Sequence, residues 1–248
     1  MAKKSGLGQN FFAHGYDISG DVGAVNNLTI SRAELLSTGI DKTAVERLAG
    51  IGDGSVDFTA FFNDAAGQEH VALKGMPSTV VMWTWLVGGV ASSAVGFSGS
   101  VQQMNYAATR GRDGSMELGA TGMAREGYPP FEDHVSVTAG KVTHASAASS
   151  ASIDGTAGTT RGGIGLLQFF SRASGTPTFL IEHSTNDSTW ATLLTFTNTG
   201  GASPFGERKT VTGAVNRYLR FTTTGTFTTA IAWVGFRRGI VGDTTDLS

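Results

Sequence analysis

Cysteine is absent from the 248-residue chain, which excludes disulfide bonds and every zinc or iron–sulfur site that depends on thiolates. Charged residues are scarce, at 15 % of the chain, and the formal net charge is −2. No segment is rich in Lys and Arg, so the sequence lacks the basic stripe of a dedicated nucleic-acid binder. The first residues, Met1 to Gly6, include two lysines but no apolar run follows them, so a signal peptide is not expected.

Sequence motifs of catalysis are also missing. The five histidines contain no His-x-x-x-His pair, and no Walker A loop or Gly-x-Ser-x-Gly elbow occurs. The runs 132–134 and 182–183 hold possible metal ligands, but neighbouring residues of a strand point to opposite faces. We therefore expect no enzyme activity, no cofactor and no metal site.

The residues that are abundant favour a β protein. The chain has 35 glycines and only 5 prolines, and its aromatic residues sit in short alternating runs. This mixture is typical of many short strands joined by glycine turns. A hydrophobic content of 40 % is enough for a packed core.

Charge is distributed unevenly along the chain. Residues 1–142 contain 10 basic and 14 acidic side chains, whereas residues 143–248 contain 8 basic and 6 acidic ones. The acidic surplus therefore belongs to the first half.

One uncharged segment, residues 79–97, is close in length to a membrane-spanning helix. It contains Gly88-Gly89 and Ser92-Ser93, and its first part is β-branched and aromatic. Two buried strands around a Gly-Gly turn fit this pattern better, so no membrane partner is expected.

The first half is predicted to form a β-sandwich or barrel with one or two short helices. Asp41 as an N-cap, the spacing of Ala44 and Leu48, and Gly50 as a stop predict a helix over residues 41–49. A second short helix is expected within residues 66–73. Strands are expected at residues 11–19, 55–62, 80–86, 94–106 and 115–123, and a loop plus a strand at 25–36.

The second half has a different texture. Residues 143–157 are rich in Ala and Ser and are predicted to be a linker, either irregular or formed by an exposed strand. Short strands separated by turns follow, at residues 163–171, 178–183, 189–197, 209–211, 218–223 and 230–237. We expect an assembly domain at 1–142, with a flexible arm at 1–10, and an outer antiparallel β-sandwich, Ig-like or jelly-roll-like, at 158–248.

Two carboxylates mark the polar faces of two alternating strands. Val56, Phe58 and Ala60 alternate with Asp57, and Met116 and Leu118 flank Glu117. Each strand follows an Asp-Gly-Ser sequence, at Asp53 and at Asp113, which is a common hairpin turn. A glycosidase would use such a carboxylate pair, but solvated strand faces are the more frequent explanation.

Aromatic residues of the second half admit two interpretations. They alternate along strands, so they are expected to fill the core of the sandwich. The alternative is an exposed glycan-binding platform. The residues concerned are Trp190, Tyr218, Phe221 and Trp233.

Several strings resemble the major tail (tail-tube) proteins of long-tailed bacteriophages that infect actinobacteria. The strings of the first half are 3–8, 15–21, 38–42, 46–48, 53–55, 61–63, 103–106 and 110–115. Strings of the second half are similar to sandwich modules appended to phage virion proteins: 181–184 with Asn186, Ser188 and Trp190, then 216–220 and 225–227.

This resemblance implies a virion protein that assembles with copies of itself into stacked, hexameric rings. The rings form a tube for genome delivery, with the tape-measure, tail-terminator and baseplate or tip proteins as partners. Asp57 and Glu117 are then candidates for an acidic channel lining, past which DNA slides without specific binding. The arm with Lys3, Lys4 and Leu7 is a candidate bridge between rings.

The expected location is the virion tail, and the host cytoplasm during assembly. Besides the glycosidase mentioned above, two other functions remain open from the sequence. One is a decoration protein of the head or tail surface, in which no tube forms. The other is a glycan-binding adhesion module that exposes Trp190 or Trp233.

Overall fold

The computed structural model describes residues 7–75, 79–125, 131–197 and 203–239. Strands hold 60 % of the residues and helix 2 %, which confirms the mainly-β prediction. The first elements are β1 (Asn10–Ala13), β2 (Tyr16–Asp17), β3 (Val22–Leu36), β4 (Arg47–Phe61), α1 (Glu69–Leu73), β5 (Val81–Leu86), β6 (Val95–Arg110), β7 (Met116–Ala124) and β8 (Glu132–Ser136). The remaining strands are β9 (Val142–His144), β10 (Ala148–Ser149), β11 (Ile153–Asp154), β12 (Gly163–Gly175), β13 (Thr178–Ser184), β14 (Ala191–Thr195), β15 (Phe205–Val211), β16 (Tyr218–Thr224) and β17 (Phe227–Arg238).

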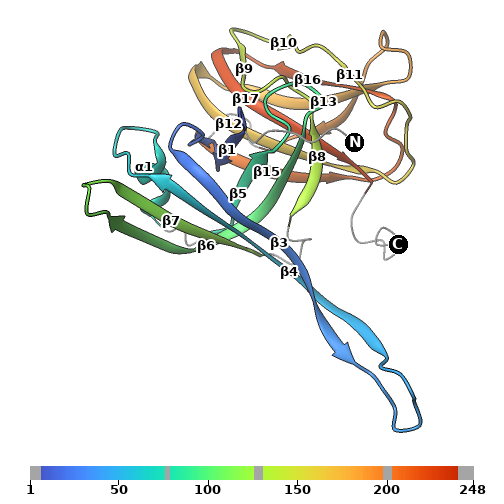
Figure 1. Cartoon of the computed structure of the whole chain (residues 1–248). Helices are drawn as coiled ribbons and strands as arrows, with labels where there is room; N and C mark the ends of the chain where they lie inside the picture. Colours follow the sequence, from blue (N-terminus) through green and yellow to red (C-terminus); the bar gives the residue numbers. More distant parts are fainter. Residues whose placement is uncertain (1–6, 76–78, 126–130, 198–202, 240–248) are drawn as a thin grey trace.

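One large antiparallel sheet connects the two halves of the chain. Its strand order is β15-β12-β17-β8-β6-β5-β1-β2, and β7, β4 and β3 extend from β6 as a branch. A five-stranded sheet, β10-β16-β13-β14 with β11, covers the β12–β17 region. In Figure 1 the two sheets form the upper body, and the long β3–β4 hairpin extends away from it.

The first core lies between the β4–β7 region and the β1–β5 region of the curled sheet. Phe58 of β4 contacts Phe11 of β1 and Trp83 of β5, with ring centroids 4.8 and 5.4 Å apart. Gly122 of β7 leaves room for Trp83, because a Cβ at position 122 would approach the indole to 2.5 Å. The short helix α1 buries Leu73 against the same core, which confirms the helix expected within 66–73.

The second half forms the expected antiparallel sandwich. Phe169 and Phe236 from the large sheet pack against Phe179 and Phe221 from the five-stranded sheet. Because β12 is buried on both faces, residues 163–170 read as a nearly continuous apolar run. Its opposite face, with Ile164 and Leu166, packs against Phe12 and Met82 of the first half.

The segment predicted as a linker is part of the sandwich. Residues 143–157 contribute to β9, β10 and β11, and these strands pair with β17 and β16. Their small side chains reflect edge positions next to larger strands, so the segment is paired β structure, as the exposed-strand alternative expects. The division into separately folding domains stays a prediction.

Three local expectations are also corrected. Residues 41–49 are not helical; they form the tip of the β3–β4 hairpin and the start of β4. The strand expected at 11–19 is instead the hairpin β1–β2, which turns at His14-Gly15, both with positive φ. Asp53-Gly54 lies inside β4, opposite Ser31 and Ile30, and not in a turn.

The uncharged segment 79–97 forms two strands, as expected. β5 and β6 pair in antiparallel register, with Trp85 opposite Phe97, and Gly89 has a φ of +82° in the connection between them. None of the helices in the described residues is long and apolar enough to cross a membrane.

A buried polar network joins the two halves. Gln168 of β12 donates to Thr84 of β5, and the Thr84 hydroxyl bonds Ser98 of β6. Ser98 in turn contacts Nε2 of His134 at 2.9 Å. Burial lowers the pKa of His134 to about 3, so its imidazole stays neutral and the network needs no counter-charge.

Candidate assembly surface

The strands β3, β4, β7 and β6 form a four-stranded antiparallel sheet with two different faces. Val56, Phe58 and Leu118 are buried on one face, in the first core. Residues directly opposite in paired strands share a face, so Asp57, Thr121 and Asn105 belong together on the other face. The body of the protein covers the first face, and only the second remains open.

The open face, called the acidic face below, carries carboxylates and no Lys or Arg at its strand positions, and the Arg125 guanidinium, just after β7, bonds Gln102 Oε1 on this face. Its residues are Ala24, Asn27, Thr29 and Ser31 of β3; Asp53, Ser55, Asp57, Thr59 and Phe61 of β4; Glu117, Gly119, Thr121 and Met123 of β7; and Gln102, Asn105, Ala107 and Thr109 of β6. Most other side chains are small and polar or small and apolar. The face therefore has negative charge without a matching positive group in these strand positions.

The structure places Asp57 and Glu117 on this one face of adjacent strands, as their alternation suggested. The Thr121 hydroxyl donates to Asp57 Oδ1 over 2.6 Å. Glu117 lies four residues from Thr121, opposite the exposed Phe61. Asp53 shares the face because it is four residues from Asp57. Sequence reasoning missed Asp53 because Asp-Gly was interpreted as a turn.

Both outer edges of this sheet lack a partner strand among the described residues. Within the described part of the chain, β3 pairs only with β4. β6 pairs with β5 as far as Val101 and with β7 on its opposite edge, so residues 102–110 have one edge without a partner strand. Unpaired edges present backbone N–H and C=O groups that a further strand can bond.

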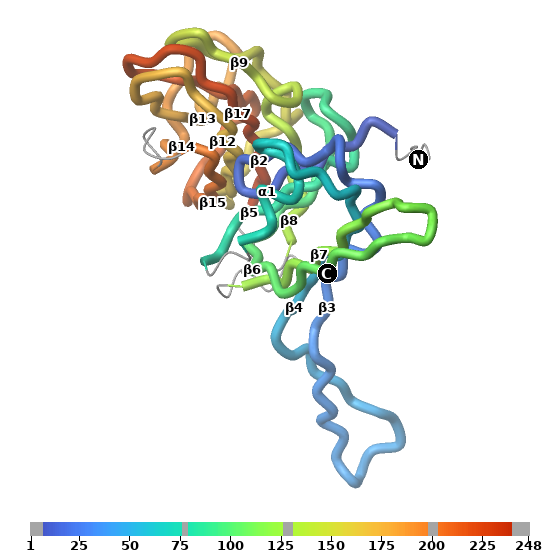
Figure 2. The backbone as a smooth tube through the Cα atoms, turned by 90° about the vertical axis from the view of Figure 1, so that its left-hand side faces the viewer, coloured from blue at the N-terminus to red at the C-terminus, as the bar shows by residue number. Residues whose placement is uncertain are grey.

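The β3–β4 hairpin is the second exposed feature. Figures 1 and 2 show it extending from the body as a single two-stranded arm. At about 3.3 Å per residue, each 15-residue strand is about 50 Å long. Its outer half exposes large apolar side chains: Ile30, Leu35, Leu36, Ile40, Val45, Leu48 and Ile51. An isolated two-stranded hairpin of this kind has marginal stability by itself, and such apolar exposure marks interaction sites.

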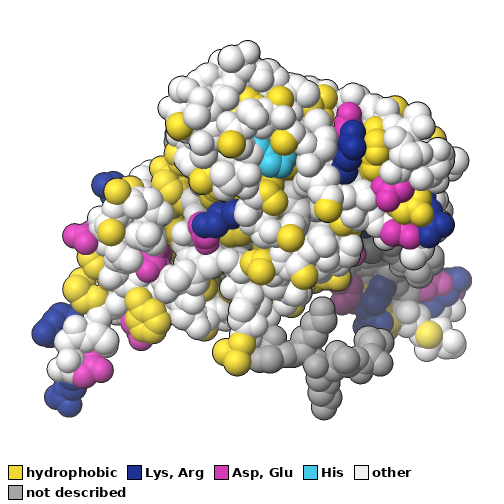
Figure 3. Space-filling model, turned by 90° about the horizontal axis from the view of Figure 1, so that it is seen from above, with side chains coloured by type: hydrophobic (Ala, Val, Ile, Leu, Met, Phe, Trp, Pro, Cys, Tyr) yellow, Lys and Arg dark blue, Asp and Glu magenta, His cyan; other side chains and the backbone are white. Residues whose placement is uncertain are grey.

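Surface charge elsewhere is mixed. Seen from above, Lys and Arg side chains lie scattered, several of them beside Asp and Glu side chains, without gathering into one basic patch (Figure 3). Two pairs of this kind are Arg217 with Asp154 and Arg220 with Glu182. This face lacks the electrostatic pattern of nucleic-acid binding.

The other predicted site residues have different outcomes. Lys3 and Lys4 lie outside the described residues, and Leu7 is exposed. Trp233 and Phe221 are buried in cores, as expected. Trp190 and Tyr218 are half-buried instead, with the Arg220 guanidinium 4.3 Å from the Trp190 ring centroid and Arg217 4.9 Å from that of Tyr218.

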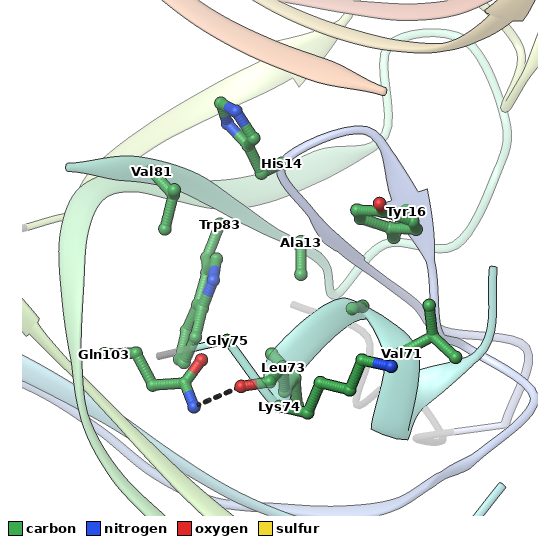
Figure 4. A pocket seen from close by; sticks show the side chains of 11 residues that line it. Ala13, His14, Tyr16, Val71, Leu73, Lys74, Gly75, Val81, Trp83 and Gln103 are labelled. Atoms are coloured by element: carbon green, nitrogen blue, oxygen red, sulfur yellow. Dashed lines mark hydrogen bonds between the residues drawn. The ribbon is translucent and has the colours of Figure 1, made fainter. Parts of the chain in front are cut away.

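A cavity of about 190 Å³ lies between α1 and the paired strands β1 and β5 (Figure 4). Trp83, Val81 and Leu73 supply apolar walls, and Gln103 Nε2 donates to the Leu73 carbonyl. No carboxylate is among the described residues that line it.

Nowhere in the described part of the chain do three potential metal ligands form a cluster. Glu132 and His134 are buried while Asp133 between them is exposed.

The chain matches no protein-family model and no curated protein. It is similar to a chain in the virion of a native gene transfer agent particle, at a TM-score of 0.41 and 11 % identity, over 53 % of this chain and 98 % of that one. A chain in the C6-symmetric tail of an empty gene transfer agent particle gives 0.37 and 13 %, over 45 % and 81 %.

The third structure is the Dit protein of phage SPP1, described as a hub of the adsorption apparatus. It has a TM-score of 0.30 and 11 % identity, over 92 % of this chain and 99 % of that chain. All three structures therefore come from gene transfer agent particles or from a phage, and all three likenesses are remote.

Proposed function

We propose that the chain is a structural protein of a phage-type virion tail, which joins copies of itself edge to edge into rings that stack as a tail tube. The observation that carries this proposal is the pair of unpaired edges on one four-stranded sheet. Neither edge is covered by another strand of the described chain. A molecule that is built to remain a monomer usually protects such edges.

The directions of the edge strands support ring formation. In a sheet of four antiparallel strands, β3 and β6 run in opposite directions. The β6 edge of one copy therefore meets the β3 edge of the next copy as an antiparallel pair. Because the two edges are different surfaces, the contact is head-to-tail, and it closes into a ring when the rotation fits.

The acidic face would then line the channel. Its opposite face is buried against the protein's own core, so only the acidic face can look toward an axis. Asp53, Asp57 and Glu117 would repel DNA phosphates, and the small neutral side chains would offer few binding groups. DNA would pass without adhering.

The hairpin arm would connect successive rings. Its apolar side chains are exposed in the single chain, and a second copy supplies a surface on which they become buried. The sandwich of the second half would lie outside the tube. Six-membered rings, a tape-measure protein inside and terminator and tip proteins at the ends follow from the sequence resemblance.

Electron microscopy of the purified full-length protein, at rising concentration, tests this function. We expect rings and tubes, and a reconstruction with Asp57 and Glu117 facing the channel. A protein that decorates a surface would remain a monomer or a small closed oligomer. A tube with both carboxylates on its outer wall would refute the channel assignment while leaving self-assembly intact.

A further inference from the structure

A buried carboxyl group without a hydrogen-bond partner lies beneath the assembly sheet. Glu69, the first residue of α1, has 0 % of its surface exposed. Neither carboxylate oxygen has a hydrogen-bond partner of normal geometry among the described residues. An ionised carboxylate in such a place is unstable unless it is paired, so the site favours the neutral, protonated form.

The groups around Glu69 reinforce this preference. Asp21, itself buried, accepts hydrogen bonds from the Glu69 backbone N–H and from Asn63 Nδ2, at 3.1 and 2.9 Å. On the other side, Tyr106 of β6 bonds the His70 imidazole through its hydroxyl. No Lys or Arg side chain is among these described neighbours.

The pKa values agree with this geometry. Burial, and then the charge of Asp21, raises the pKa of Glu69 from 4.5 to about 7, and the Asn63 backbone acts weakly in the opposite direction. The pKa of Tyr106 is raised as well, by burial and by the charge of Glu69. The Glu69 carboxyl group therefore changes its charge in the physiological range.

The same residues hold the two assembly edges in place. Asp21 directly precedes β3, and its carbonyl accepts from the Phe61 N–H at the end of β4. On the β6 side, α1 contacts Tyr106 through His70 and Gln103 through the Leu73 carbonyl. Movement of α1 thus reaches both the start of β3 and the unpaired part of β6.

We propose that Glu69 is a proton-operated latch: a protonated carboxyl group keeps α1 docked under the sheet that carries both unpaired edges, and loss of the proton loosens α1. When α1 is docked, the edges of β3 and β6 are held in place for pairing with another copy. Protonation of Glu69 therefore favours assembly. This last step rests on the proposed function, whereas the loosening of α1 does not.

The direction of the pH effect follows from the raised pKa. The docked state binds the proton more tightly than the undocked state, so docking is most stable below pH 4.5 and weakens as pH rises through 7. With these two values, the docking constant falls roughly 30-fold between pH 5.5 and pH 8.5.

Amide hydrogen exchange of the unassembled full-length chain measures this directly. The His70, Ala72 and Lys74 amides, which bond to Asn63, Gln68 and His70 carbonyls, report on α1. After correction for intrinsic exchange, we expect their protection to fall roughly 30-fold over that pH range in the wild type. In Glu69→Gln, protection should stay high and constant.

Two further variants complete the test. Asp21→Asn removes a neighbouring charge, so it should shift the transition to lower pH. Asp64→Asn removes an exposed acid of the same connection and should behave as the wild type does. Protection that is independent of pH in the wild type, or a Glu69→Gln variant with unchanged pH dependence, overturns the latch.

A measurement on the wild type covers the case in which Glu69→Gln does not fold. The carbon-13 shift of the Glu69 carboxyl group should titrate with a midpoint near 7. A midpoint near 4.5 overturns the latch. If exchange confirms the latch but no rings form at any pH, the proposed function fails and the latch stands.

Discussion

Tubes should disappear, while rings persist, when residues 31–53 are replaced by Asn-Gly. Ile30 and Gly54 are directly opposite in the β3–β4 register, so a two-residue turn can close the shortened hairpin between them. The deleted part contributes nothing to the buried cores. Thermal unfolding of the shortened monomer should therefore match the wild type, and electron microscopy should show rings without long stacks.

A second variant keeps the full length of the hairpin and changes only its exposed apolar side chains, so it separates the effect of arm length from the effect of arm chemistry. Leu36, Ile40 and Ile51 are exposed by 71, 109 and 87 %, and burial of such side chains contributes about 1.5–3 kcal/mol each. Replacing all three by Gln should raise the concentration needed for stacking about a thousandfold or more. Ser37→Ala with Thr38→Ala, in the same arm, should leave stacking unchanged. Normal tubes from both the shortened variant and the triple Gln variant would show that the arm does not connect rings.

Breaking the Glu132–Arg208 ion pair should cost about 3–5 kcal/mol of unfolding free energy. Arg208 of β15 bonds both carboxylate oxygens of Glu132 of β8, at 3.0 and 2.6 Å, and their side chains are only 8 and 2 % exposed. Glu132→Gln keeps the shape but removes the carboxylate charge to which the buried guanidinium bonds. At about 2–4 °C per kcal/mol, the melting temperature should fall by about 10 °C.

The matched control is an exposed pair with the same chemistry. Arg217 also bonds both oxygens of Asp154, at 2.7 and 2.5 Å, but both side chains are more than 40 % exposed. Asp154→Asn should leave the melting temperature unchanged, because water screens exposed pairs. Equal effects in the two variants would mean that burial does not set the importance of the Glu132–Arg208 pair.

Alternation along the chain predicted most of the strands, because the large sheet has one buried face over much of its length. The buried residues Val56, Phe58 and Ala60 alternate with half-exposed neighbours in the structure, as they do in the sequence. The same alternation correctly placed Asp57 on the open face. Alternation predicts which face of its strand a residue occupies. That Asp57 and Glu117 lie on neighbouring strands is known only from the register of β4 with β7.

The hairpin tip was mispredicted for an energetic reason. Residues 41–49 contain a capping residue and helical spacing, but a nine-residue helix needs an apolar surface to pack on. All nine side chains are exposed in the structure. With no core to cover, the chain continues the pairing of β3 with β4, which local propensity does not reveal.

Long-range contacts explain what the sequence could not show about the carboxyl groups. Asp21 and Glu69 are 48 residues apart and meet only because α1 docks beside the start of β3. Nothing in their neighbouring residues distinguishes them from exposed acids. Composition also left the structure of the Ala/Ser-rich segment 143–157 open, because small residues suit strands at a sheet edge as well as a linker.

Cysteine cross-linking tests the edge-to-edge contact most directly, because the chain has no cysteine of its own. Ala24→Cys on β3 is combined in turn with Gln102→Cys, Asn105→Cys, Ala107→Cys and Thr109→Cys on β6. Within one chain these two strands are three strand spacings apart, about 14 Å. That is beyond the reach of a disulfide, which requires Cα atoms within about 7 Å.

Oxidation of assembled protein should give a ladder of covalent multimers for at least one of these pairs, and that pair identifies the register between copies. Each single-cysteine variant should give no covalent dimer, because the contact joins unlike edges. Particles that assemble normally but yield no ladder with any pair, or only dimers from the single-cysteine variants, would contradict assembly through the β3 and β6 edges.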